Sequence, residues 1–341
     1  MPRPLDAFPR FPLAHLPTPL AGMPRLREAL MREAGGTLPR LYIKRDDCTG
    51  LAGGGNKTRK LEFLIGEAIA SGADTVVTTG ALQSNHARQT AAAAAVAGLS
   101  CVLVLFDTVP YTGRNYRRSG NLLLDAVLGA EVRTVQAEAD AGAVFAGVMD
   151  ELRAAGRTPY FVPAGGSSAI GSLGYTGAYL ELAEQLDKAG ISDAVVIHAS
   201  SSGGTQAGLI AGACYRGNGP EVSAINVYRS DADAMAEGIH ALACKTAALI
   251  EAPAPSPGAV LLDSSQLGER YGMPTDAMCR AVELVARTEG VLIDPVYTGK
   301  GMAGFIAQLL AGGHSGREAA IFLHTGGMPG LFAYEEEFGS K

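Results

Sequence analysis

The chain has 341 residues, of which 18% are charged, and a formal net charge of −6; this length suits one or two globular domains, and this charge offers no basic field for nucleic acid or an anionic membrane surface. The N-terminal region lacks an apolar signal core and no run approaches about 18 apolar residues, so we expect a cytoplasmic protein without a membrane span. The cysteines are scattered, odd in number and without a Cys-x-x-Cys pair, which disfavours a disulfide framework or a zinc site; they are Cys48, Cys101, Cys214, Cys244 and Cys279.

Short apolar runs and helical patterns alternate along most of the chain. The expected strands cover residues 41–44, 75–79, 101–106, 131–135, 160–162, 194–199, 223–227, 291–294 and 320–324. The expected helices cover residues 57–71, 84–97, 120–128, 171–188, 205–214, 231–250 and 275–288. Alternation of this kind predicts an α/β fold whose mainly parallel sheets are covered by helices on both faces.

The first segment that predicts chemistry is residues 53–60, Gly-Gly-Gly-Asn-Lys-Thr-Arg-Lys. Three glycines directly before Asn56 and Lys57 allow a sharp turn and leave room beside the lysine amine. A lysine confined in this way loses solvation, which lowers its pKa and frees the amine for Schiff-base chemistry. A flexible surface loop is the simpler alternative. A Walker phosphate loop is disfavoured because Asn56 stands where that motif requires glycine.

Residues 80–86, Gly-Ala-Leu-Gln-Ser-Asn-His, follow an expected strand and open an expected helix. Ser84 is suited to cap the N-terminus of that helix. The free N–H groups of Asn85 and His86 then form a carboxylate site at the positive helix end. Capping alone is the alternative, and no Gly-x-Ser-x-Gly elbow is present to support a hydrolase triad.

Residues 200–208, Ser-Ser-Ser-Gly-Gly-Thr-Gln-Ala-Gly, again lie between an expected strand and an expected helix. Hydroxyl groups, glycines and the N–H donors of a helix start form a cradle suited to a phosphate dianion. The segment differs from Gly-x-Gly-x-x-Gly, so an NAD-type dinucleotide site fits poorly. A structural turn is the alternative, although a turn needs few of these hydroxyls.

Residues 294–300, Asp-Pro-Val-Tyr-Thr-Gly-Lys, follow the expected strand at 291–294. In open α/β sheets, ligands bind beyond the carboxyl ends of the strands. Tyr297 and Thr298 are therefore candidates for lining the same crevice. A tyrosine packed in the core or in a turn is the commoner alternative.

Taken together, these segments resemble the fold-type II pyridoxal 5′-phosphate (PLP) enzymes, in the branch that contains D-cysteine desulfhydrase, L-cysteate sulfo-lyase and 1-aminocyclopropane-1-carboxylate (ACC) deaminase. The resemblance runs from about residue 8 to residue 334. The motifs that carry it are residues 17–20, 43–47, 54–57, 83–85, 203–208, 294–297 and 324–327.

The resemblance implies that PLP is the cofactor and that Lys57 is both its Schiff-base partner and the group that moves the α-proton. It implies that Asn85 bonds the ring hydroxyl and that Thr298 faces the pyridine nitrogen. The phosphate is expected to contact Lys60 and a loop comprising Ser201, Ser202, Gly203, Gly204 and Thr205. The substrate is expected to lie against Ser84, Asn85, His86, Tyr271 and Tyr297. The expected catalytic residues are Lys57, Ser84, Tyr271 and Tyr297, and no metal is expected.

The resemblance also implies two open, twisted, mainly parallel sheets, one in each of two domains. Residues 1–56 and 168–341 are expected to form the large PLP-binding domain, and residues 57–167 a small inserted α/β domain. Family members are commonly homodimers. A homodimer is therefore expected, with a small amino acid as substrate and with no nucleic-acid or membrane partner.

The implied reaction is a β-elimination that releases pyruvate, ammonia and either sulfide from D-cysteine or sulfite from L-cysteate. ACC deaminase is the alternative, and Thr298 argues against it because ACC deaminases carry glutamate directly after the tyrosine. A neutral threonine cannot act as the counter-ion that holds a pyridine nitrogen protonated. Thr298 is typical of the desulfhydrases, whereas residues 46–50 and 242–246 resemble the sulfo-lyase, so the two sulfur substrates remain open. A non-catalytic PLP-binding protein conflicts with the intact Lys57, Ser84, Tyr271 and Tyr297.

Overall fold

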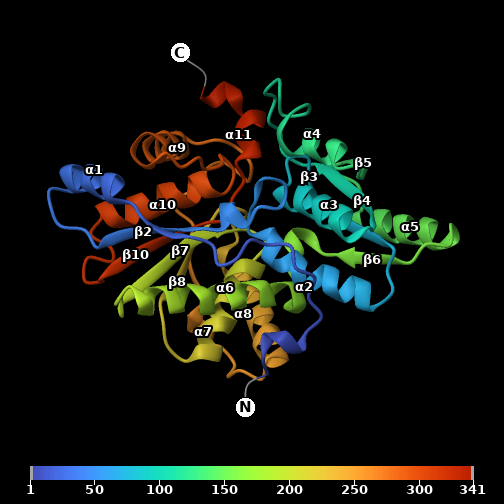
Figure 1. Ribbon diagram of the computed structural model, residues 1–341. Coiled ribbons are helices and arrows are strands. Elements are labelled where there is room, and N and C mark those ends of the chain that lie inside the picture. Colours follow the sequence, from blue (N-terminus) through green and yellow to red (C-terminus); the bar gives the residue numbers. More distant parts are fainter. Residues whose placement is uncertain (1–2, 339–341) are drawn as a thin grey trace.

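Two β-sheets organise residues 3–338, the part of the chain that the computed structural model describes (Figure 1). The larger sheet has six strands in the order β1-β2-β10-β7-β8-β9, and only the β1–β2 pair is antiparallel. Its strands are β1 (Leu20–Gly22), β2 (Arg40–Arg45), β7 (Ala194–Ser200), β8 (Glu221–Asn226), β9 (Leu261–Asp263) and β10 (Ala319–His324). The smaller sheet is parallel, in the order β5-β4-β3-β6. Its strands are β3 (Thr75–Ala81), β4 (Ser100–Asp107), β5 (Glu131–Gln136) and β6 (Pro159–Val162).

Helices cover both faces of the larger sheet, as the alternating pattern predicts. One face carries α1 (Pro24–Ala34), α9 (Asp276–Glu289) and α10 (Thr298–Leu310), and the other carries α6 (Ala169–Lys188), α7 (Gly204–Arg216) and α8 (Ala232–Leu249). Successive side chains of a strand point to opposite faces. Accordingly Val195 and Ile197 pack under α9 and α10, whereas Val196 between them packs against α6 and α7.

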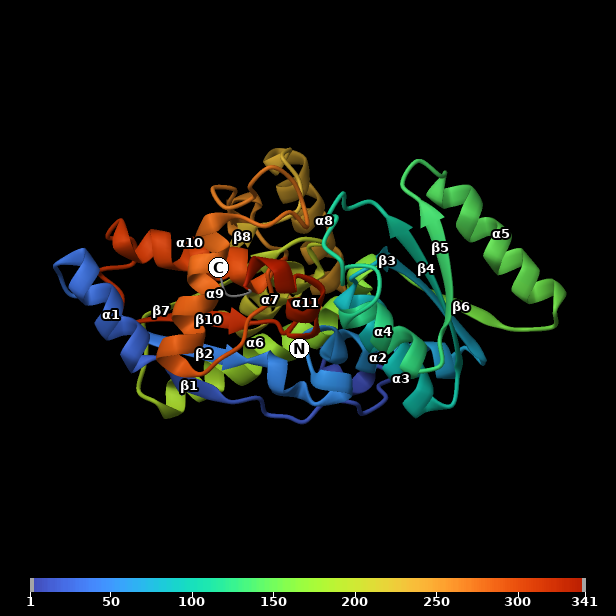
Figure 2. The same ribbon diagram turned by 90° about the horizontal axis from the view of Figure 1, so that it is seen from above.

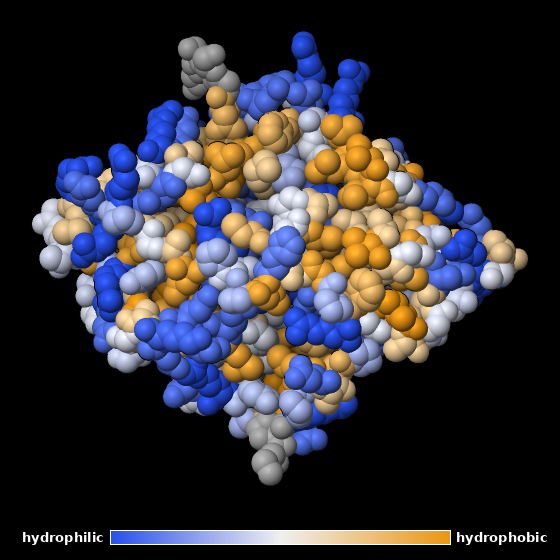
Figure 3. Space-filling view, viewed as in Figure 1, coloured by the Kyte–Doolittle hydropathy of each residue, from blue (hydrophilic) through white to orange (hydrophobic). Residues whose placement is uncertain are grey.

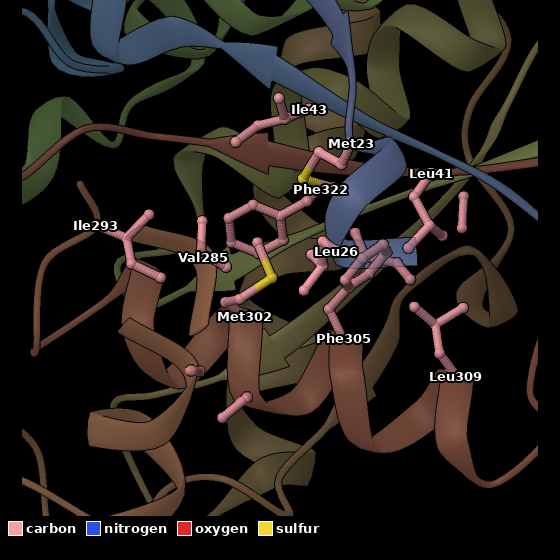
Figure 4. Packing of buried hydrophobic residues seen from close by; sticks show 14 of the residues in the cluster. Met23, Leu26, Leu41, Ile43, Val285, Ile293, Met302, Phe305, Leu309 and Phe322 are labelled. Carbon is pink, nitrogen blue, oxygen red and sulfur yellow. The ribbon is translucent and has the colours of Figure 1, made fainter. Parts of the chain in front are cut away.

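The packed layer under α1, α9 and α10 is shown in Figure 4. Phe322 of β10 and Phe305 of α10 lie with ring centroids 5.8 Å apart, and Met23, Leu26 and Met302 surround them without solvent exposure. Burial of each such side chain contributes about 1.5–3 kcal/mol. This layer holds the strand ends of the larger sheet in fixed positions.

The smaller sheet stands beside the larger one, with α5 (Ala141–Ala154) on its outer face (Figure 2). Its other face packs against α2 (Lys57–Ala70), α3 (Asn85–Ala97) and α4 (Gly120–Val127). All four strands lie between residues 75 and 162, within the expected insertion at 57–167. The domain boundaries themselves stay a prediction. The remaining elements are α11 (Pro329–Ala333) and short 3-10 turns at Leu5–Ala7, Asp46–Thr49, Leu51–Gly53, Ala164–Gly166, Pro257–Ala259 and Glu335–Glu337.

One expected strand is wrong: residues 291–294 are an irregular segment. Side chains take the backbone groups that a strand would pair, because His324 Nε2 lies 3.1 Å from the Leu292 carbonyl oxygen and Asp294 N donates to Thr298 Oγ1 at 2.7 Å. The sequence patterns also missed β1, β9, α1, α5, α10 and α11. Among the helices of residues 3–338, none combines the length and apolarity that a bilayer crossing demands.

Candidate active site

A cavity of about 1210 Å³ lies between the two sheets, beyond the carboxyl ends of β3, β4 and β7. Strand ends of parallel sheets leave such crevices because the chain turns away into helices there. Ten residues expected from the sequence line this one cavity: Lys57, Ser84, Asn85, His86, Ser201, Ser202, Gly203, Thr205, Tyr271 and Tyr297. The tertiary structure therefore brings together segments that lie as far apart as residues 57 and 297.

The glycine loop before Lys57 has a backbone that other residues cannot follow. Gly54 and Gly55 have φ angles of 74° and 132°, and a Cβ on Gly54 would lie 1.8 Å from the Asp47 carbonyl oxygen. Asp47 and its neighbours pack against the loop, which places Lys57 as the first residue of α2 with its amine toward the cavity. The glycines are thus needed for close backbone packing.

The Lys57 amine is poorly solvated. Burial lowers its pKa to about 8, Asp294 partly opposes this effect, and the nearby Arg88 cation lowers the pKa further. Its Nζ lies 3.1 Å from Asn56 Oδ1. An amine with a pKa near 8 is neutral in a useful fraction of molecules near neutral pH, so it can act as a nucleophile and as a base.

The loop between β7 and α7 has backbone donors and hydroxyl groups suited to an anion, and we call it the cradle. Gly203 has a φ angle of 81° and caps α7, which leaves the first N–H groups of the helix at its open end. Ser167 joins the loop, since its hydroxyl donates to Ser202 Oγ at 2.8 Å and accepts from Gly204 N at 3.2 Å. Sequence reasoning did not single out Ser167, although it lies shortly after the end of β6 at Val162.

Lys60 lies directly beneath this cradle, one helical turn after Lys57. Its Nζ donates to the Gly165 carbonyl oxygen at 3.1 Å, and a Cβ on Gly204 would lie 2.9 Å from the same Nζ. Burial, with the Lys57 cation in addition, lowers the pKa of Lys60 well below its ordinary value. A phosphate dianion bound in the cradle would supply the missing negative charge.

The start of α3 forms the opposite wall of the cavity. Ser84 caps the helix as expected, with Oγ accepting from Ala87 N at 3.1 Å. The ring of buried His86 is engaged elsewhere: Thr78 Oγ1 donates to the Val162 carbonyl oxygen at 2.8 Å, so it accepts from His86 Nε2 at 2.8 Å. Burial lowers the pKa of His86 well below its ordinary value, with the Lys57 and Lys60 cations in addition, so the ring is neutral. The backbone N–H of His86, rather than its ring, is the group available for an anion.

Two tyrosines pack together on the third wall. The phenol oxygens of Tyr271 and Tyr297 are hydrogen bonded to each other, and their ring centroids lie 5.8 Å apart. Burial raises the pKa of both phenols, so both are protonated near neutral pH. Sequence reasoning overlooked Tyr228, whose ring meets Tyr271 edge to face at 5.4 Å. Tyr228 lies two residues after the end of β8, so the rule that ligands bind beyond the carboxyl ends of strands could have found it.

Thr298 lies behind the cavity wall and is not among the residues that line it. Its hydroxyl donates to Asp294 Oδ1 at 2.5 Å and accepts from Asp294 N at 2.7 Å. The same oxygen lies 3.4 Å from the carbonyl oxygen of Gly326, a lining residue. Its expected contact with the cofactor ring therefore stays a prediction.

Comparison with known proteins agrees with this architecture. A model of the pyridoxal-phosphate dependent enzymes matches residues 12–326, and the chain belongs to this family. D-cysteine desulfhydrases of Salmonella paratyphi B and Salmonella newport are each 42% identical over 331 residues, covering 97% of this chain and 97% of each relative. The crystal structure of an ACC deaminase homologue is 36% identical with a TM-score of 0.84, covering 98% of this chain and 96% of that one. A PLP-dependent aspartate racemase, 17% identical with a TM-score of 0.64 over 91% and 90% of the two chains, shares the fold alone.

The residues of the cavity fit pyridoxal phosphate. The cofactor needs a lysine amine for its aldehyde and donors for its phosphate. Lys57 meets the first need, and the α7 cradle with Lys60 beneath it meets the second. Among residues 3–338 there is no group of three or more His, Cys, Asp or Glu side chains arranged to hold a metal ion.

Proposed function

We propose that this chain is a PLP-dependent carbon–sulfur lyase that eliminates the β-substituent from a small cysteine-like amino acid, with D-cysteine as the first candidate substrate. The observation that carries the proposal is the Lys57 amine, with its lowered pKa, placed at a cavity that also holds an anion cradle. The identity of 42% over 97% of the chain with D-cysteine desulfhydrases supports the substrate. The products are pyruvate, ammonia and sulfide.

When bound, the cofactor supplies the electron withdrawal that makes the substrate α-proton acidic. Lys57 would hold the cofactor, and its Nζ would receive the α-proton of the substrate. A pKa near 8 suits this role, because general bases work best when their pKa lies near the working pH. Departure of sulfide from Cβ and addition of water complete the reaction.

The remaining cavity residues position the two molecules. The cradle residues Ser201, Ser202, Gly203, Gly204 and Thr205, together with Lys60, bind the phosphate. Ser84 and the N–H groups of Asn85 and His86 bind the substrate carboxylate at the positive end of α3. Asn85 also donates its amide to the ring oxygen of the cofactor. Tyr271 and Tyr297 are protonated phenols, and they flank the substrate and hydrogen bond to its departing group.

L-cysteate is the second candidate substrate, and a specific observation favours it. Three cations, Arg229, Lys245 and Arg270, line the cavity mouth, where Glu269 is the one acidic side chain among the lining residues. A positive mouth attracts an anionic β-substituent such as a sulfonate and raises its rate of association. ACC is the alternative outside sulfur chemistry. Neutral Thr298 provides no counter-ion for a protonated ring nitrogen, which disfavours ring opening.

An assay of keto-acid release tests the proposal. Purified enzyme is incubated with D-cysteine, L-cysteine, L-cysteate, β-chloroalanine or ACC, and pyruvate and 2-oxobutyrate are measured separately. Pyruvate and sulfide from D-cysteine would support the first candidate, and pyruvate and sulfite from L-cysteate the second. Formation of 2-oxobutyrate from ACC as the dominant product would overturn the carbon–sulfur lyase assignment.

We further propose a homodimer in the cytoplasm. Apolar side chains gather on the surface over α4 and α11 in Figure 3, and Leu123, Val127 and Phe332 there are 50%, 72% and 59% exposed. Exposed apolar patches of this kind mark protein interfaces. Cys48, Cys101, Cys214 and Cys244 are free thiols, which suits a reducing compartment. Light scattering on wild type and on a Val127→Asp variant tests the dimer, and a monomeric wild type would contradict it.

A further inference from the structure

A chain of buried hydrogen bonds sets the direction of the Asn85 amide. Arg88 of α3 can only donate hydrogen bonds, and its Nε lies 3.0 Å from Asn121 Oδ1. The oxygen end of the Asn121 amide therefore faces Arg88. The nitrogen end, Asn121 Nδ2, then donates to Asn85 Oδ1 at 2.9 Å and to the Gln83 carbonyl oxygen at 3.2 Å.

This order leaves the nitrogen of the Asn85 amide as its free end. Asn85 lines the cavity, and its Oδ1 is already occupied by Asn121. Arg88 and Asn121 are both completely buried, so water does not compete for these hydrogen bonds. Arg88 is itself held in place, because its Nη1 donates to the carbonyl oxygens of Ala52 and Gly54 in the glycine loop.

We propose that Asn121 is a positioning residue that keeps the NH₂ group of Asn85 directed at the ring oxygen of the cofactor. The inference rests on the proposed role of Asn85 as a donor to that oxygen. If the amide were inverted, Asn85 Oδ1 would face the negatively charged ring oxygen, and an attractive contact would become a repulsive one. We call this chain of Arg88, Asn121 and Asn85 the relay. Each of its hydrogen bonds fixes which end of the next side chain donates and which accepts, from the glycine loop to the cofactor.

The relay makes a specific prediction. A substitution that turns the donor end of Asn121 into an acceptor should also turn over the Asn85 amide. In Asn121→Asp one carboxylate oxygen still accepts from Arg88, but the other cannot donate to Asn85 Oδ1. The Asn85 amide then turns over to donate its NH₂ to that carboxylate, and its oxygen faces the cavity. Loss of a hydrogen bond to a charged partner is worth roughly a 10- to 150-fold change in affinity.

The experiment measures two properties of the holoenzyme: the dissociation constant for PLP, by titration of apo-protein, and the visible absorbance maximum. We expect Asn121→Asp to raise the dissociation constant roughly 10- to 150-fold and to shift the maximum in the same direction as Asn85→Ala. Thr90→Ala is the matched control, since Thr90 is buried on α3, the helix of Asn85 and Arg88, and its hydroxyl donates to the His86 carbonyl oxygen at 2.9 Å, outside the relay. It should change neither property.

A double-mutant cycle separates the relay from a structural effect. Combined with Asn85→Ala, Asn121→Asp should add nothing further, because its target amide is gone. If Asn121→Asp changes the dissociation constant and the absorbance maximum equally in wild type and in Asn85→Ala, the inference is overturned. If Asn85→Ala alone changes neither property, the role of Asn85 and the relay both fail, while pyruvate release by wild type still upholds the lyase. If Asn121→Asp does not fold, Asn121→Ala replaces it in the double-mutant cycle. Its effect on the dissociation constant should be smaller, and it too should vanish when combined with Asn85→Ala.

Discussion

Asn56 Nδ2 donates to Thr205 Oγ1 at 3.0 Å, which joins the residue directly before Lys57 to the first turn of α7. The two residues are 149 positions apart in the chain. The hydrogen bond fixes the distance between the lysine proposed to take the cofactor aldehyde and the cradle proposed for its phosphate. One rigid cofactor must reach both, so this distance matters for binding.

We expect Thr205→Ala to weaken PLP binding more than it slows turnover of the saturated enzyme. The variant loses a hydroxyl at the phosphate and leaves Asn56 Nδ2 without its partner. The expected loss is about 1.5–3 kcal/mol, measured by PLP titration of the apo-variant. Thr205→Ser retains the hydroxyl and serves as the control. An unchanged dissociation constant in Thr205→Ala would show that the cradle does not hold the phosphate.

We expect Lys57→Ala to lose the covalently bound cofactor and at least about 10³-fold of the rate, since one side chain supplies both attachment and proton transfer. Borohydride reduction of wild type followed by peptide mapping identifies the attached lysine. Lys60 is the internal control, because it is buried one turn away on the same helix. Label on Lys60 instead of Lys57 would contradict the assignment.

The lowered pKa of Lys57 predicts how cofactor capture depends on pH. Only the neutral amine attacks an aldehyde, so the rate at which apo-protein captures PLP should rise with pH, with a midpoint near the pKa of about 8. An ordinary lysine would give a midpoint near 10.4, that is roughly 2 units higher. Stopped-flow absorbance across this pH range gives the midpoint. A midpoint near 10 would show that burial does not tune the amine.

Thr298 is expected to matter for stability. Its buried hydroxyl makes two hydrogen bonds with Asp294, so Thr298→Val should lower the free energy of unfolding by about 1–3 kcal/mol. Thr298→Ser retains the hydroxyl and should stay close to wild type. Urea unfolding of the apo-proteins measures the change. If Thr298→Val keeps full stability but alters the cofactor absorbance, its hydroxyl contacts the ring, as the family resemblance implies.

A buried ion cluster holds α2 in place. Arg59 of α2 pairs with Asp46 at 2.9 Å and with Glu181 of α6 at 2.9 Å, and Lys44 also pairs with Glu181. Burial opposes ionisation of both carboxyl groups, but Arg59 outweighs it and holds the pKa of Asp46 and Glu181 below their ordinary values. The unfolded chain therefore binds protons first as pH falls, and stability is lost below about pH 4.

We expect Glu181→Gln to lower the free energy of unfolding by about 3–5 kcal/mol at neutral pH, since it leaves buried Lys44 without its ion-pair partner. The loss of stability on acidification should also become shallower. Glu28→Gln breaks the exposed pair with Arg32 and is the control, with an expected change within about 0.5 kcal/mol. Urea unfolding at neutral pH and near pH 4 tests both. Equal effects of the two variants would contradict a structural role for the cluster.

Much of the fold and of the candidate site could be predicted from local sequence. The alternation of apolar runs indicated the parallel sheets, and the glycine and hydroxyl segments at 53–60, 80–86 and 200–208 mark residues that now line one cavity. The strand predicted at residues 291–294 was wrong, because the side chain of His324, 32 residues further along the chain, hydrogen bonds to the Leu292 carbonyl oxygen. Tyr271 came only from family resemblance, since no local pattern distinguishes it from a packed tyrosine.

The sequence by itself determined where the backbone turns sharply and where helices begin, because these depend on the residues at each position: glycines at 53–55 and at 203, and a serine cap at 84. Only the tertiary structure decided which polar atoms meet. Asn121 reaches Asn85 across 36 positions, and Asn56 reaches Thr205 across 149. A side chain's hydrogen-bond partner depends on how helices and sheets pack, and that packing is set by the burial of apolar surface across the whole chain.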